Sequence, residues 1–147
     1  MQFLIMWSLA AVATVATSQR AVWPDLVPVQ SVVDGGTIDV GVYRRIHLAG
    51  VSVPRGGRGL EPGEPFAREA RMRLDALVGH RFVHLEFPSL TSRRSAYVVL
   101  DDGTFVNARL VEEGLARVSG HPAGDRGEAL LGAQARAKAA RLGVWSR

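Results

Sequence analysis

Apolar and polar residues alternate along the segment that begins near residue 29. An apolar run ends at Val33 and is followed by Asp-Gly-Gly-Thr at 34–37, a sequence typical of a tight hairpin turn with positive φ. Apolar-rich segments at 38–42 and 43–51 come next. This pattern predicts a meander of three strands joined by tight turns.

The alternation within 43–51 also assigns the two faces of the third strand. Ile46 and Leu48 fall on one face, whereas Arg45 and His47 fall on the other. If the apolar face lies inside, the two basic residues share an outward groove.

The rest of the chain changes between helical and strand patterns. A Gly- and Pro-rich loop at 54–65 precedes apolar residues at helical spacing, which stop at Gly79. The predicted elements are a helix at 66–78, strands at 82–87 and 96–100, and helices at about 105–118 and 128–142 joined by a connector at 121–127. Five short strands and three helices predict a β-barrel with helices packed on it, an α+β arrangement similar to the OB-fold.

An uncharged segment opens the chain and contains a dense apolar block from Phe3 to Ala16. The block has about the length of a signal-peptide core and is shorter than the ~20 residues of a membrane span. We therefore predict a signal peptide or N-terminal membrane anchor at 1–20, a lead-in at 21–28 and one domain at 29–147. The protein is then exported (periplasmic or extracellular) or anchored to the membrane. No Lys or Arg precedes the block, so a misassigned start codon and a buried core helix are alternatives.

The composition restricts the chemistry that the chain can perform. It has 147 residues, with 18 Lys and Arg against 14 Asp and Glu, and 0 Cys. The lack of cysteine excludes disulfides, thiolate metal sites and thiol nucleophiles. Of the 18 Lys and Arg residues, all except Lys138 are arginine, whose planar guanidinium suits phosphate and carboxylate. Biased codon usage is a competing explanation for the arginine content.

Several motifs, in order, resemble the staphylococcal nuclease (thermonuclease) family. They are 32–40 (VVDGGTIDV), 45–55 (RIHLAGVSVPR), 65–70 (PFAREA), 93–98 (RRSAYV), 102–107 (DGTFVN), 110–116 (LVEEGLA) and 143–146 (GVWS). The resemblance covers about residue 29 to the end of the sequence. It implies a five-stranded OB-fold barrel with three helices, and hydrolysis of the phosphodiester backbone of DNA and RNA with one calcium ion.

The resemblance also implies where such a site would lie in this chain. The positions are Gly36 and Ser52 for two aspartate ligands, Val53 for a carbonyl ligand, Arg55 for a glutamate, and His47 and Arg93 for two arginines. Calcium takes about 6 to 8 oxygen ligands, with carboxylates supplying most of the attraction. Because only Arg93 keeps the family's charged residue type, we expect no calcium site, no other cofactor and a pseudo-nuclease.

Basic residues are expected to surround the groove in place of the missing carboxylates. The candidates for nucleic-acid or anion binding are Arg45, His47, Arg55, Arg93 and Arg94. Contacts from such residues to phosphates weaken with salt and carry little sequence information. We therefore predict a non-catalytic monomer that binds nucleic acid, another polyanion or a protein partner, with the N-terminal segment in contact with the membrane if it is uncleaved. Guanidinium groups scattered without a ligand are the alternative explanation.

A divergent nuclease is the competing functional hypothesis. It requires a carboxylate relocated into the site, from Asp34, Asp39, Glu61 or Glu64, or acid–base chemistry by His47 with Arg93. Simpler roles for the carboxylates are a turn for Asp34, an outward strand position for Asp39 and solvated loop charges for the two glutamates.

Overall fold

A closed barrel forms the centre of the structure. The computed structural model describes residues 21–22, 26–41, 44–89 and 91–147. Within these residues the barrel strands are β2 (Val27–Asp34), β3 (Thr37–Val40), β4 (Arg44–Leu48), β6 (Phe82–Phe87) and β7 (Ser95–Val99). The first three form an antiparallel meander, β7 runs parallel to β4, and β6 pairs with both β7 and β2, which closes the barrel. The predicted five-stranded OB-fold is confirmed.

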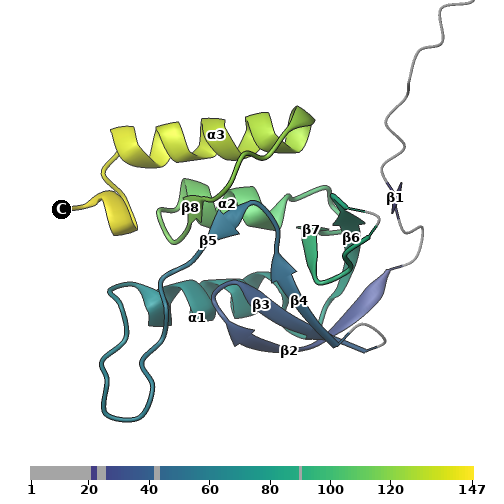
Figure 1. The fold of residues 1–147 in the computed structure, drawn as a ribbon, viewed down its shortest axis with the longest axis horizontal. Coiled ribbons are helices and arrows are strands. Elements are labelled where there is room, and N and C mark those ends of the chain that lie inside the picture. The colour runs from purple at the N-terminus through teal and green to yellow at the C-terminus, as the bar shows by residue number, and fades with distance from the viewer. Residues whose placement is uncertain (1–20, 23–25, 42–43, 90) are drawn as a thin grey trace, which may run out of the picture.

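Three α-helices cover the barrel in the described part of the chain. They are α1 (Ala67–Val78), α2 (Val106–Glu112) and α3 (Gly124–Ala139). Figure 1 shows α2 between α3 and α1, with the long loop after β5 extending away from the barrel. The remaining elements are β1 (Ala21–Val22), which pairs with the end of β6, a ladder of β5 (Val51–Ser52) with β8 (Arg117–Val118), and a 3₁₀ turn at Gly143–Trp145.

The core contains the apolar residues that alternate with polar ones along the strands. Ile38 and Ile46 are cross-strand partners and are fully buried, and Leu48 lies beside them in the same core. Arg45 and His47, which alternate with them along β4, are exposed. The predicted division of this strand into an inner apolar face and an outer basic face is therefore confirmed.

Bidentate ion pairs connect α1 and α3 to neighbouring elements. Arg126 of α3 donates two hydrogen bonds to Glu86 of β6, at 2.7 and 2.9 Å, and stacks over Phe105. Arg73 of α1 donates two hydrogen bonds to Glu113 after α2, at 2.7 and 2.8 Å. Hydrogen bonding to Glu86 raises the pKa of Arg126 further above its ordinary value, so the guanidinium is always charged.

The buried Asn107 side chain, on the first turn of α2, connects three segments of backbone. Its Oδ1 accepts the N–H of Val98 at 2.9 Å, and its Nδ2 donates to the carbonyls of Ala49 at 2.9 Å and Ala96 at 3.3 Å. The side chain is fully buried, so no water can replace these bonds. Asn107 therefore holds the turn after β4 against β7.

The glycines of the β2–β3 turn serve a purpose that the sequence did not suggest. Neither Gly35 nor Gly36 has a positive φ, so that expectation is wrong. The Asp34 carboxylate instead accepts the Gly36 N–H at 2.8 Å, which stabilises the turn. A Cβ on Gly35 would lie 2.7 Å from the Cβ of Ala70, so glycine is required here for the close approach of α1.

Three predicted elements have different limits. The strand expected at 43–51 breaks after Leu48, because Gly50 turns the chain with a φ of 72°. The helix expected at 105–118 ends at Glu112, since Gly114, with a φ of 74°, packs directly on the Leu142 carbonyl. The last helix begins at Gly124, inside the predicted connector.

Two further results concern the N-terminal segment and membrane-spanning helices. The predicted signal or anchor segment at 1–20 lies outside the described residues. Among the helices that are described, none has the length and apolar character needed to cross a membrane.

Replacing Asn107 with alanine should destabilise the fold by about 3 kcal/mol, because buried N–H and C=O groups lose their partners. Urea unfolding followed by tryptophan fluorescence measures this change. The control is Gln30→Ala, which removes an exposed amide and should stay within about 0.5 kcal/mol of the parent protein. An Asn107→Ala variant that unfolds at the parent's urea concentration would contradict the role assigned to this side chain.

Gly35→Ala should cost about 2 kcal/mol, because the new methyl group pushes α1 away from the turn. The matched control is Gly56→Ala, where a Cβ meets nothing within 4 Å, and its stability should remain within about 1 kcal/mol of the parent. Thermal unfolding followed by circular dichroism compares the two. Equal melting temperatures for both variants would show that the turn and α1 are not in tight contact.

Candidate nucleic-acid groove

A groove of about 600 Å³ opens at the mouth of the barrel. It is bounded by the β2–β3 turn, the chain between β4 and β5, the start of β7 and the segment after β8. Its lining residues are Asp34, Gly36, Thr37, His47, 48–53, Pro88, Ser95, Ser119 and Gly120. The groove thus contains the outward face that the sequence assigned to His47.

His47 is held at the groove by its neighbours on both adjacent strands. Its Nδ1 lies 3.0 Å from the hydroxyl of Thr37, its cross-strand partner on β3. Its backbone N–H donates to the Arg94 carbonyl at 2.8 Å, and Ser95 is its partner on β7. The imidazole is exposed and its orientation is set by the threonine, which suits a contact to an anion.

Arg93 and Arg94 lie directly before β7, next to the same side of the groove. Both side chains are exposed, and the chain that carries them is tied to β4 through the Arg94 carbonyl. The structure therefore places the backbone of Arg94 beside His47, although neither Arg93 nor Arg94 is among the residues that line the groove.

Arg45 and Arg55 are placed elsewhere. Arg45 lies two residues along β4 from His47, with its Nε 3.8 Å from an oxygen of Asp39, and it does not line the groove. Arg55 lies in the loop after β5, and its backbone N–H donates to Glu64 at 2.7 Å. Its side chain is 89% exposed, with its Nε 3.8 Å from Glu64. Both pairs are solvent-exposed, so each contributes little to stability.

The four carboxylates that might rebuild a metal site are occupied or dispersed. Asp34 lines the groove but accepts the Gly36 N–H in its own turn. Asp39 faces outward beside Arg45, as expected. Glu61 is an exposed loop residue, but Glu64 is not simply solvated, because it binds the other end of its loop at Arg55. Among the described residues, no group of three His, Asp or Glu side chains could hold a metal ion together.

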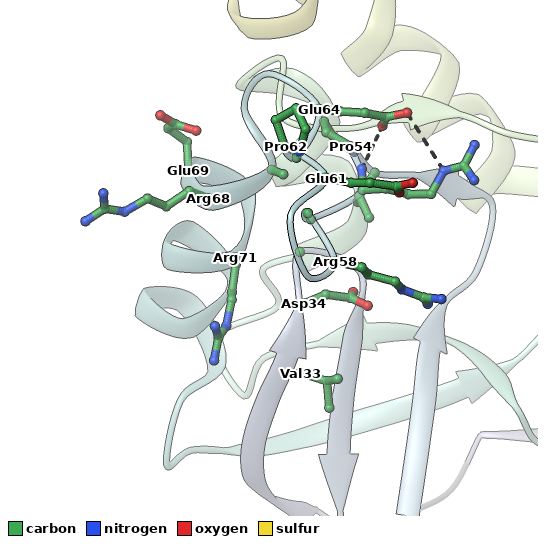
Figure 2. Close-up of a pocket in the computed structure, with 17 residues that line it drawn as sticks. Val33, Asp34, Pro54, Arg58, Glu61, Pro62, Glu64, Arg68, Glu69 and Arg71 are labelled. Atoms are coloured by element: carbon green, nitrogen blue, oxygen red, sulfur yellow. Dashed lines mark hydrogen bonds and ion pairs between the residues drawn. The ribbon is translucent and has the colours of Figure 1, made fainter.

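A larger cavity of about 1010 Å³ lies beside the groove, between the loop after β5 and the start of α1. Figure 2 shows this cavity, with dashed lines joining Glu64 to the backbone and side chain of Arg55. Its lining carries four arginines and four acidic residues: Arg55, Arg58, Arg68, Arg71, Asp34, Glu61, Glu64 and Glu69. Because these charges balance, the cavity offers an anion no net attraction.

The positions that the resemblance assigns to calcium ligands can be located directly. Gly36 is buried, and a Cβ there would lie 2.9 Å from the Val53 side chain. Ser52 is exposed on β5 and is the cross-strand partner of Arg117 on β8. Gly36 carries no side chain, and Ser52 offers an uncharged hydroxyl.

Sequence reasoning missed two groups of groove residues. Thr37 was assigned to a turn, and only its register with His47 shows that it belongs to the groove. Ser119 and Gly120 were missed because the chain before them was predicted to be helical, whereas it forms β8. The glycine at 114, inside the expected helix, was the signal that could have located this break.

Comparisons with known proteins agree with this architecture. A sequence model of the staphylococcal nuclease homologue family matches residues 45–147. The thermonuclease of Staphylococcus intermedius is 32% identical over 127 residues, covering 81% of this chain and 75% of that protein. The probable endonuclease LCL3 of Verticillium alfalfae is 33% identical over 114 residues, covering 69% of this chain but only 38% of that protein. On its barrel, its ordered motifs and these matches, the chain belongs to the staphylococcal nuclease homologue family.

Proposed function

We propose that this chain binds the phosphate backbone of nucleic acid in the groove and does not perform calcium-dependent hydrolysis. The observation that carries the proposal is the exposed imidazole of His47 in the groove, beside the chain segment that carries Arg93 and Arg94. Asp34, the carboxylate that lines the groove among the described residues, is engaged in a turn, and the Arg94 carbonyl accepts the backbone N–H of His47. Cationic and hydrogen-bonding side chains at a concave surface favour phosphates, and their contacts position a strand without reading its sequence.

The residues at the family's calcium positions do not fit a calcium ion. Gly36 offers no side chain, and Ser52 supplies a neutral oxygen in place of a carboxylate. The cation Arg117 lies opposite Ser52, and Arg55 stands where a glutamate is expected. A divalent ion at this position would lack charged ligands and would be repelled by its neighbours.

The segment at 1–20 completes the proposal. Its uncharged apolar block supports export of the binding domain or its attachment to a membrane. In either case the domain meets nucleic acid or another polyanion outside the cytoplasm.

A divergent nuclease is the second candidate function. It is favoured by the two relatives, which are named as a thermonuclease and a probable endonuclease. In this chain it would require hydrolysis with His47 as acid or base and Arg93 on the phosphate. His47 already has Thr37 as a hydrogen-bond partner, and neither residue supplies an activated water.

A calcium titration of the full chain tests the loss of the ion site. Isothermal calorimetry should detect no stoichiometric uptake at millimolar calcium, because the described residues contain no group of three His, Asp or Glu side chains that could hold the ion. A single-stranded oligonucleotide incubated with the protein should stay intact with calcium or with EGTA. Saturable calcium binding accompanied by cleavage that Arg93→Ala abolishes would establish the nuclease instead.

Binding of a fluorescein-labelled 16-nucleotide oligothymidylate by the full chain, followed by anisotropy, tests the groove. The variant Arg93→Ala/Arg94→Ala should weaken binding about tenfold at low salt, because two cations near the groove are removed. The control Arg81→Ala/Arg109→Ala removes the same charge from exposed positions that line none of the cavities described here, and should change affinity less than threefold. Equal losses in the two variants would show that net charge, and not the groove, governs binding.

A further inference from the structure

The positive charge of this protein is concentrated at one end of the sequence. Residues 1–128 contain 14 Lys and Arg and 14 Asp and Glu, so they are neutral in sum. Residues 129–147 contain Arg136, Lys138, Arg141 and Arg147 and no acidic residue, so they supply the whole formal charge of +4. Arginine-rich composition alone would spread this excess over the chain, so its position requires another explanation.

Among the described residues, Arg136 is the member of this segment that forms an ion pair. It donates to Glu112 at 3.0 Å. Lys138 and Arg141 are exposed, and the backbone N–H of Arg141 donates to the Lys138 carbonyl at 3.1 Å. Arg147 is also exposed and lines the same cavity as Arg117. We call Arg117, Lys138, Arg141 and Arg147 the C-terminal basic cluster.

The ring of Trp145 holds two members of this cluster in place. The guanidinium carbon of Arg117 lies 4.7 Å from the ring centroid, and the Nζ of Lys138 lies 4.6 Å from it. Arg117 also donates to the Val144 carbonyl at 3.5 Å. Cation–π contacts restrict these flexible side chains before any ligand arrives, which reduces the entropy that binding an anion would cost.

The cluster is continuous with the groove. Ser52 and Val53 line both the groove and a neighbouring cavity of about 400 Å³, whose other lining residues include Arg117 and Arg147. Arg117 is also the cross-strand partner of Ser52 in the β5–β8 ladder. Glu64 is the acidic residue that lines this second cavity, and it is already in contact with Arg55. Two adjoining cavities therefore lead from His47, over β5, to Arg117 and Arg147 of the cluster.

We propose that the C-terminal basic cluster is a second contact region for the phosphates of a single-stranded nucleic acid that also occupies the groove. This inference rests on the function proposed above, and it assigns the strand a path across the β5–β8 ladder. A single strand can follow this surface, whereas a duplex is stiff over such lengths and resists bending. Site sizes of about 4 to 16 nucleotides are usual for OB-folds, which accommodates both regions.

Oligonucleotide length separates the two regions in an experiment on the full chain. Anisotropy is recorded with labelled oligothymidylates of 4 and 16 nucleotides, for the parent and for Lys138→Ala/Arg141→Ala. The 16-mer should bind the variant about tenfold more weakly at low salt, and the slope of log K against log salt should become shallower by about 1.4, for two lost phosphate contacts. The 4-mer, held in the groove alone, should change less than twofold. Arg81→Ala/Arg109→Ala is again the charge-matched control.

The outcomes distinguish this inference from the proposed function. Unchanged 16-mer binding by Lys138→Ala/Arg141→Ala, while Arg93→Ala/Arg94→Ala weakens it, would overturn the second region and leave the groove. Equal losses of 4-mer and 16-mer affinity in Lys138→Ala/Arg141→Ala would also overturn the proposed path, because the cluster would then bind nucleic acid without the groove. If neither oligonucleotide binds the parent protein, the proposed function itself fails. Binding of anionic phosphatidylglycerol vesicles that the cluster variant loses, with the 16-mer unaffected, would assign the cluster to a membrane surface instead.

Discussion

The hydrogen bonds of the buried Asn107 side chain are the interaction on which the shape of the groove depends. One side chain satisfies backbone groups of Ala49, Ala96 and Val98, so the turn after β4, strand β7 and helix α2 are fixed relative to one another. Ala49 lines the groove, and Ser95, one residue before Ala96, lies opposite His47. In a dry interior, each of these backbone groups would be costly to leave unpaired. These bonds therefore fix the backbone at the floor of the groove.

The barrel separates most of the residues that form the core from those that line the groove. Along β3 and β4 the side chains that point inward, such as Ile38 and Ile46, are completely buried, while Thr37 and His47 belong to the groove. The helices are fastened on other surfaces, through Arg126 with Glu86 and Arg73 with Glu113. Leu48 and Ala49 belong to both the core and the groove, but His47 and the ion pairs of the helices lie outside the core. The charge at the groove can therefore change with little effect on packing.

Pattern reasoning located most of the barrel and part of the site. Alternation along 43–51 identified which residues of β4 face the core and predicted that His47 faces outward, where it lines the groove. It failed at breaks that depend on distant contacts. Gly50 interrupts a strand, and Gly114 ends a helix because its backbone packs against Leu142 and Gly143. Leu142 and Gly143 are far from Gly114 in the sequence, so the local periodicity did not indicate these contacts.

The sequence by itself determined the order of the five barrel strands and the α-helices, the inward face of β4 and the placement of all net positive charge after residue 128, since these follow from local pattern and composition. Only the tertiary structure decided which charges act together. It paired Arg45 with Asp39 and Arg55 with Glu64, removed both from the groove, and brought Arg117 beside Ser52 and Trp145. The physical reason is that electrostatic attraction depends on distance in space and on solvent exposure, and chain folding sets both.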